Sequence, residues 1–165
     1  PPPPLAPRYG SKFEAISSDA YLSMVGGLGS LANGLGRTQW GLFQDMVGFK
    51  KLFTLLTAMQ GATMLLYKYT TDSKLLFEAA TMVLFLCLGG NFAMAPGTCA
   101  KLFGAELGPK VFAILFTAFG TAAIGGAKVN KLLLGTHGFD GIFKAMAASS
   151  VLAGVTVNTM LKEDV

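Results

Sequence analysis

Residues 75–100 read LLFEAATMVLFLCLGGNFAMAPGTCA, and this stretch decides the fold class. Its single charged residue is Glu78, close to its beginning. A helix needs about 20 mostly apolar residues to cross a bilayer, where its backbone polar groups must bond to one another. The stretch meets that length and does not alternate apolar with polar residues, as a strand of a membrane barrel would. It therefore predicts a transmembrane helix.

Four further apolar stretches lie on either side of this one, at residues 19–44, 52–69, 107–134 and 142–161. The polar breaks between the stretches are short, at residues 45–51, 70–74, 101–106 and 135–141. Breaks of this length make consecutive helices antiparallel neighbours. We therefore expect an all-α integral membrane protein with about five transmembrane helices and no extramembrane domain.

The two ends of the chain differ from this helical region. The first residues, PPPPLAP, favour an extended polyproline conformation, and the last four, KEDV, are mostly charged. We divide the chain into a proline-rich extended segment (1–18), a five-helix membrane domain (19–161) and a charged tail (162–165). Because the chain begins with Pro1, we expect that an initiator methionine and an unknown length of sequence have been lost.

The composition excludes several classes of protein. Charged residues make up 13% of the 165 residues and hydrophobic residues 52%. Globular chains carry about 25% charged residues, so this chain lacks the solvated surface of a soluble enzyme. Its 13 Lys and Arg residues outnumber its 9 Asp and Glu residues, which gives a net charge of +4. The basic residues form no stripe of the kind that a nucleic-acid interface needs. We expect other membrane protein subunits and lipids as partners, and no nucleic acid.

No group of residues is typical of catalysis or of a bound metal. The nucleotide-binding pattern GxxxxGK[ST], the zinc pattern HExxH and the nucleophile pattern GxSxG are all absent. Cys87 and Cys99 stand in apolar surroundings without metal-ligand spacing, which favours a packing role. His137 is the single histidine and has no acidic or thiol companion at ligand spacing. The sequence predicts a protein that is not an enzyme and has no metal or cofactor.

Small residues recur every fourth position in two of the apolar stretches. The first series is Gly26, Ser30 and Gly34, and a second includes Thr121 and Gly125. Such series let two helix backbones approach closely, which replaces the hydrophobic driving force that is missing between helices in lipid. We interpret them as helix-packing seams. The alternative is a functional role in which the glycines let one helix bundle rock against another.

Residues 41–51, which read GLFQDMVGFKK, carry a family resemblance. Its spaced positions are Gly41, Asp45, Gly48, Lys50 and Lys51. A glycine permits a tight reversal, an aspartate caps a turn or pairs with a base, and lysines anchor at lipid headgroups. The pattern resembles the loop motif that joins the second and third helices of each half of a major facilitator superfamily transporter. It departs from that family at Met46, where a basic residue is usual.

Other segments look like the oxalate/formate and monocarboxylate branch of this superfamily. Residues 89–96 (GGNFAMAP), 102–104 (LFG) and 115–126 (LFTAFGTAAIGG) resemble its tenth and eleventh helices. Residues 33–37 (NGLGR) resemble its eighth helix, where an arginine faces the anion path. The resemblance runs from about residue 19 to residue 161. It implies the C-terminal half of such a transporter, helices eight to twelve, without a counterpart of helix seven.

The resemblance implies a substrate site at Arg37, Asn33 and Asn91, in which Arg37 binds a carboxylate bidentately. An arginine within an apolar span costs about 2.5–3.5 kcal/mol, so its side chain must face protein, water or an anion. A structural alternative pairs Arg37 with Asp45 or with backbone carbonyls. Because oxalate-transporting members have a lysine where Phe119 stands, we expect this site to be incomplete and vestigial.

Lys128 and Lys131 end the fourth apolar stretch. Long cationic side chains at helix ends extend to the membrane interface and can contact anionic headgroups. We take both as candidate lipid-headgroup ligands.

These observations favour a structural function. Major facilitator transport needs two six-helix halves that rock around a shared site, and five helices do not enclose such a path alone. We therefore predict a non-catalytic accessory subunit of a larger organellar bioenergetic complex, a respiratory complex or ATP synthase, in the mitochondrial inner membrane. The alternative is a fragment or half-unit of a major facilitator-type monocarboxylate or organic anion transporter. A membrane electron carrier is disfavoured, since one loop histidine does not supply axial ligands.

Overall fold

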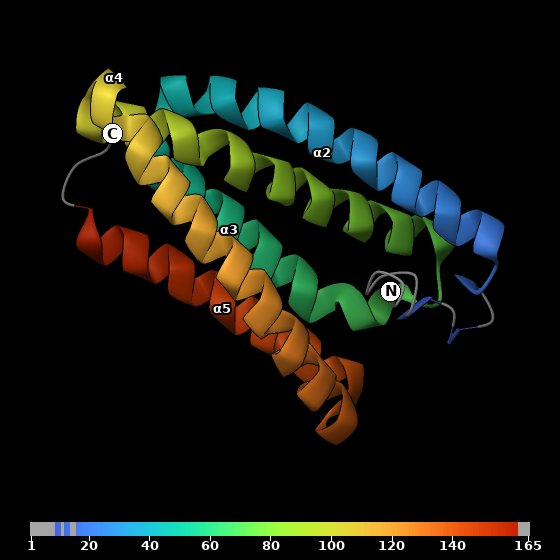
Figure 1. Ribbon diagram of the computed structural model, residues 1–165. Coiled ribbons are helices and arrows are strands. Elements are labelled where there is room, and N and C mark those ends of the chain that lie inside the picture. The colour runs from blue at the N-terminus through green and yellow to red at the C-terminus, as the bar shows by residue number, and fades with distance from the viewer. Residues whose placement is uncertain (1–8, 11, 14–15, 162–165) are drawn as a thin grey trace.

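The computed structural model describes residues 9–10, 12–13 and 16–161. From Asp19 onward four α-helices and one 3₁₀ helix follow one another, and none of the described residues forms a strand (Figure 1). They are α2 (Asp19–Val47), α3 (Phe49–Leu66), the 3₁₀ helix η2 (Tyr67–Thr70), α4 (Lys74–Thr136) and α5 (Gly138–Met160). The predicted all-α class is therefore confirmed for the described residues.

The third and fourth predicted spans belong to one element, α4, so the expected polar break at residues 101–106 is wrong in extent. Helical structure continues up to Gly104 and resumes directly after it. Gly104 has φ 76° and ψ 173°, and there the chain reverses direction (Figure 1). We call residues 74–103 the first arm and residues 105–136 the second arm. The breaks before α3 and α5 are similarly short, at Gly48 and His137.

Gly104 yields a testable prediction about this turn. Its φ and ψ lie in a region that is essentially restricted to glycine, and side chains there cost about 1–3 kcal/mol. No other group lies within 4 Å of a Cβ built at Gly104, so backbone strain is the whole effect. Gly104→Ala should lower the free energy of unfolding by that amount, measured by thermal unfolding in mild detergent. Gly120→Ala is the matched control, and equal stability of both variants would contradict the prediction.

Helix α2 packs along the first arm of α4, and glycine makes their close approach possible. A Cβ built at Gly29 would lie 2.9 Å from the Phe85 ring, and one at Gly36 would lie 2.6 Å from the Leu86 carbonyl oxygen. The Trp40 indole nitrogen donates a hydrogen bond to that same oxygen, at 3.1 Å. The buried residues of α2 recur at helical spacing and form one side of the helix. They are Leu22, Val25, Gly29, Ala32, Gly36, Trp40 and Gln44.

Two further contacts complete the bundle. Helices α3 and α5 pack through Gly61 and Gly154, each of which lies against the opposite helix. At the end of the bundle formed by η2, the Tyr67 hydroxyl lies 2.7 Å from the Thr81 hydroxyl. Tyr9 and Ile16 are buried in the cluster around Tyr67. The rest of the predicted segment 1–18 lies largely outside the described residues, and the predicted tail 162–165 lies wholly outside them.

The second arm of α4 is the least buried part of the bundle. Within it only Gly108 is buried, whereas long apolar side chains such as Ile114, 73% exposed, face outward. Exposed leucines also occur along α2 and α5, for example Leu31 and Leu152, each 65% exposed. Among the described helices, α4 and α5 are long and apolar enough to cross a membrane.

Candidate functional site

Arg37 lies on an exposed side of α2 and is oriented by two neighbours. Its Nε donates a hydrogen bond to the Asn33 side-chain oxygen at 3.3 Å, one helical turn earlier. Its guanidinium carbon stands 5.3 Å from the centre of the Phe92 ring, from the first arm of α4. In the described part of the chain no carboxylate forms an ion pair with Arg37. The guanidinium therefore retains hydrogen-bond donors for an anion from outside the chain.

Asp45, the alternative partner for Arg37, is occupied elsewhere. Its carboxylate lies 3.3 Å from the Lys101 amino group, at the end of the first arm. This ion pair ties the end of α2 to the turn of α4. The structure therefore contradicts the pairing of Arg37 with Asp45.

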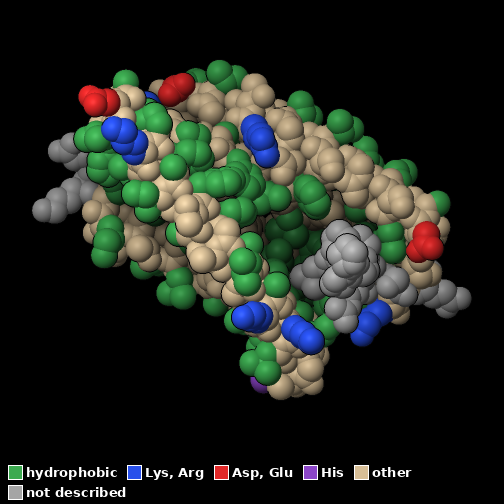
Figure 2. Space-filling model, viewed as in Figure 1, with side chains coloured by type: hydrophobic (Ala, Val, Ile, Leu, Met, Phe, Trp, Pro, Cys, Tyr) green, Lys and Arg blue, Asp and Glu red, His purple; other side chains and the backbone are tan. Residues whose placement is uncertain are grey.

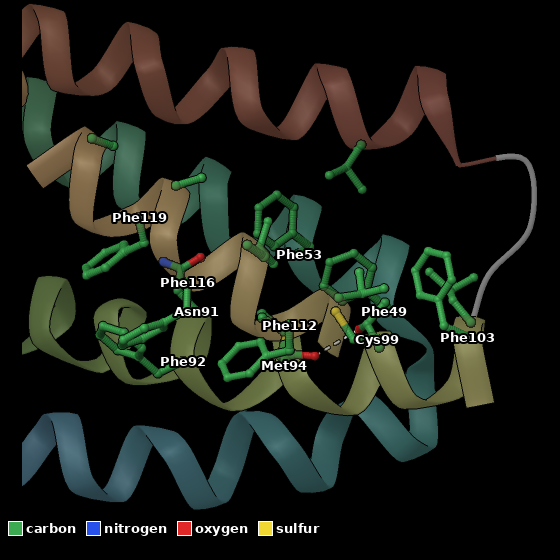
Figure 3. Close-up of a pocket in the computed structure, with 18 residues that line it drawn as sticks. Phe49, Phe53, Asn91, Phe92, Met94, Cys99, Phe103, Phe112, Phe116 and Phe119 are labelled. Carbon is green, nitrogen blue, oxygen red and sulfur yellow. Dashed lines mark hydrogen bonds between the residues drawn. The ribbon is translucent and has the colours of Figure 1, made fainter. Parts of the chain in front are cut away.

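Two phenylalanine rings of the second arm of α4 pack against Phe92 of the first arm. The ring centres of Phe92 and Phe119 are 5.1 Å apart in an edge-to-face arrangement. Phe116 lies 6.2 Å from Phe92 and stacks on Phe119 at 5.8 Å. Such aromatic pairs contribute about 0.5–1.5 kcal/mol beyond their buried area. We call Phe92, Phe116 and Phe119 the aromatic cluster (Figure 3).

The aromatic cluster forms one wall of a cavity of about 570 Å³. Helix α3 contributes Phe49 and Phe53, and α5 contributes Val157. Figure 3 shows the aromatic cluster between the two arms of α4, with Phe49 and Phe53 on the neighbouring helix. Phe92 thus borders the cavity and also contacts Arg37, which joins the two features into one candidate site.

Asn91 lies on the cavity wall beside the aromatic cluster, on the first arm of α4 (Figure 3). Its side-chain nitrogen donates a hydrogen bond to the Cys87 carbonyl oxygen at 3.2 Å. The structure therefore brings Arg37 and Asn33 together, whereas Asn91 lines the cavity and donates to Cys87 instead. Substrate binding by these residues stays a prediction.

The loop-motif residues join three parts of the bundle. Gly48 has φ 89° between α2 and α3, a backbone conformation that favours glycine. The Lys50 amino group donates a hydrogen bond to the Leu161 carbonyl oxygen at 2.8 Å, after the end of α5. Lys51 is exposed, and a Cβ built at Gly41 would meet no atom within 4 Å.

The other predicted residues lie on outward surfaces. No atom lies within 4 Å of a Cβ built at Gly26, Gly34 or Gly125, and both Ser30 and Thr121 are exposed. These seams therefore pack against no described helix, and their role as contact surfaces stays a prediction. Lys128 and Lys131 are exposed on the second arm, and their role as headgroup ligands stays a prediction. The described residues contain no group of three potential metal ligands.

Sequence reasoning missed two features of this region. Phe92 was not singled out, although its place one residue after Asn91 puts it beside the predicted site. Gln44 was treated as the end of a span, yet it is buried and its amide donates a 2.9 Å hydrogen bond to the Thr98 hydroxyl. The spacing of Gln44 from Trp40 and Gly36, four residues each, is the signal that could have placed it on the buried side of α2.

Ion pairs lie at both ends of the bundle. At the end opposite Asp45, the Asp140 carboxylate lies 3.1 Å from the Lys68 amino group and also pairs with Lys144. The hydrogen bond to Asp140 raises the pKa of Lys68. Figure 2 shows most charged side chains of this face toward the ends of the helices. Arg37 is therefore unusual as a charge near the middle of a helix.

Comparison with known proteins identifies transporters as relatives. The chain is 27% identical over 143 residues to apicoplast pyruvate carrier 1 of Toxoplasma gondii, covering 86% of this chain and 26% of that carrier. It is 29% identical over 105 residues to apicoplast pyruvate carrier 2 of the same organism, covering 63% and 16%. It is 24% identical over 125 residues to the oxalate:formate antiporter of Oxalobacter formigenes, covering 75% and 30%. No protein-family model and no solved structure matches the chain.

These relatives correct the predicted function. They are carriers and an antiporter, and not subunits of a respiratory complex or of ATP synthase, so the prediction of an accessory subunit is wrong. The similarity to the oxalate:formate antiporter supports the resemblance to that transporter branch. The chain spans less than a third of the length of each of these three relatives. It is therefore similar, over most of its own length, to part of a transporter.

Proposed function

We propose that this chain forms part of a major facilitator-type carrier that moves monocarboxylates across an organellar membrane. The observation that carries the proposal is Arg37, a cation in mid-helix, unpaired with any described carboxylate and adjacent to an apolar cavity. A planar guanidinium binds a carboxylate through two parallel hydrogen bonds. The relatives named as pyruvate carriers support a monocarboxylate as the substrate.

Membrane insertion explains the exposed apolar surface. In the most apolar windows of α4 and α5 only 28% of residues are buried, whereas a core helix of a soluble protein is mostly buried. Contiguous apolar surface of this extent marks contact with lipid or with other helices. The ion pairs of Asp45 and of Asp140 then lie at the two membrane interfaces, where charges are tolerated. In this arrangement α2 and α3 also cross the membrane, as the sequence predicts.

The remaining helices of the carrier would contact the outward seams of this chain. Major facilitator carriers share their substrate site between two halves that rock against each other. Gly26, Ser30 and Gly34 share α2 with Arg37, and Thr121 and Gly125 share the second arm with Phe119. Small residues at such surfaces allow helices to approach closely and to move. We propose these seams as contact surfaces, and Lys128 and Lys131 as headgroup ligands.

Transport of a monocarboxylate tests the proposal directly. The full natural polypeptide that contains these residues would be reconstituted into proteoliposomes, and uptake of labelled pyruvate would be measured against an internal pool of unlabelled pyruvate. We expect saturable uptake of labelled pyruvate that unlabelled monocarboxylate abolishes. Labelled glucose should not be taken up. If pyruvate, lactate and acetate all fail to exchange while the protein is folded in the vesicles, the proposal is overturned.

A further inference from the structure

The cavity beside Arg37 is lined mostly by apolar side chains. None of the residues that line it is charged, and its polar members are Asn91 and Thr98, both already hydrogen-bonded within the chain. Arg37 is therefore the one described cation that contacts a cavity-lining ring of the aromatic cluster. A ligand held here would have one end at a guanidinium and the other end among phenylalanine rings.

The size of the cavity exceeds what a methyl group requires. A volume of about 570 Å³ falls within the range of sites that bind drug-sized ligands, about 300–1,000 Å³. The rings of Phe92, Phe116 and Phe119 form a triangle on the wall of this space, with centres 5.1, 5.8 and 6.2 Å apart. Such a cluster of rings suits an aryl or branched alkyl group, which would pack edge-to-face or stacked against it.

The same surroundings disfavour a second carboxylate. A carboxylate that enters an apolar cavity loses its hydration, and the loss is compensated only by a cation or by several hydrogen-bond donors. The lining residues include no cation, and Asn91, whose side-chain nitrogen already donates to the Cys87 carbonyl oxygen, has only one further N–H to offer, fewer than a buried carboxylate needs. A dicarboxylate held at Arg37 would leave its second charge without a partner among the described residues.

We propose that this carrier selects monocarboxylates with a bulky apolar side chain, aryl or branched alkyl, and rejects dicarboxylates. The proposal rests on the proposed function and deepens it by naming the substrate class. The carboxylate binds Arg37, and the side chain of the substrate enters the cavity across the aromatic cluster. Pyruvate, with a methyl group, uses the guanidinium and leaves the cavity largely unfilled.

Competition between substrates tests this selectivity. In proteoliposomes that hold the full natural polypeptide, labelled phenylpyruvate, pyruvate and succinate would be compared at equal concentration. We expect uptake of phenylpyruvate at least tenfold faster than uptake of succinate and with a lower KM than pyruvate. If pyruvate is transported and phenylpyruvate is not, this inference is overturned and the proposed function remains intact. Transport of none of the monocarboxylates overturns the proposed function itself.

A cavity-filling variant links the selectivity to this cavity. Ala118 lines the cavity from the second arm, so Ala118→Phe should lower the ratio of phenylpyruvate to pyruvate uptake at least tenfold. Ile114→Phe is the matched control, because Ile114 lies on the same arm, is 73% exposed and does not line the cavity. If Ala118→Phe does not fold, the smaller change Ala122→Leu at another lining position replaces it. An unchanged ratio in the folded cavity variant overturns the proposal.

Discussion

Replacing Arg37 with glutamine should lower monocarboxylate uptake by about 100-fold or more. Each hydrogen bond to a charged group contributes about 1.5–3 kcal/mol, and a bidentate pair supplies two of them. Every 1.36 kcal/mol corresponds to a tenfold change in rate. The substitution should leave the bundle folded, because Arg37 is exposed and its described contacts are limited to Asn33 and Phe92.

A lysine at the same position separates charge from geometry. Arg37→Lys keeps the positive charge but loses the planar pair of donors, so we expect an uptake about tenfold below that of the natural protein. Initial rates of pyruvate exchange in proteoliposomes measure both variants. Lys110→Gln serves as the control, since Lys110 is exposed on the second arm, does not line the cavity and should retain uptake. Undiminished uptake by Arg37→Gln would contradict the assignment of Arg37 to the substrate site.

The helices were predictable because their signal is local. A run of about 20 apolar residues specifies a helix without reference to the rest of the chain. The turn of α4 was harder to predict, because six residues between two apolar runs look like a polar loop. The structure needs a single glycine, Gly104, since φ 76° reverses the chain within one residue. A glycine requirement of that kind depends on the dihedral angles, which residue type alone does not reveal.

The packing surfaces were less predictable because they depend on which helix lies opposite. Helix α2 carries small residues in two registers, one at Gly26, Ser30 and Gly34 and another at Gly29 and Gly36. The spacing of these small residues is compatible with either register as the packing surface. The contact with the first arm of α4 selects the second register, and the first faces outward. Periodicity therefore identifies candidate surfaces, and only the position of the neighbouring helix decides between them.

The site was partly predictable, and the function was wrongly predicted for a physical reason. Arg37 stands out because a charge in an apolar helix is costly and needs a compensating role. The aromatic cluster does not stand out, because phenylalanine is common in every apolar stretch and Phe92 and Phe119 meet only after the chain turns at Gly104. The helix count led to the wrong function. Five helices do not enclose a transport path by themselves. Their number does not reveal whether they belong to a larger protein that does.

Gly36→Ala should destabilise the bundle more than an ordinary helix substitution. A Cβ at Gly36 would lie 2.6 Å from the Leu86 carbonyl oxygen and 3.2 Å from the Leu86 Cα. Both atoms belong to the backbone of α4, so neither moves aside by a side-chain rotation. Inserting one carbon into a well-packed contact costs about 1–3 kcal/mol. The same shift would lengthen the 3.1 Å hydrogen bond from the Trp40 indole to that carbonyl oxygen.

A second glycine of α2 isolates this packing effect from helix propensity. Gly27 is exposed and a Cβ there would meet nothing within 4 Å, so Gly27→Ala should gain about 0.5–1 kcal/mol from the stiffer unfolded chain alone. Gly36→Ala receives the same gain, so the difference between the two variants measures the contact with Leu86. Thermal unfolding in mild detergent, followed by circular dichroism, should put Gly36→Ala about 1–3 kcal/mol below Gly27→Ala. Equal stabilities would mean that α2 and α4 are not held at the backbone distance described here.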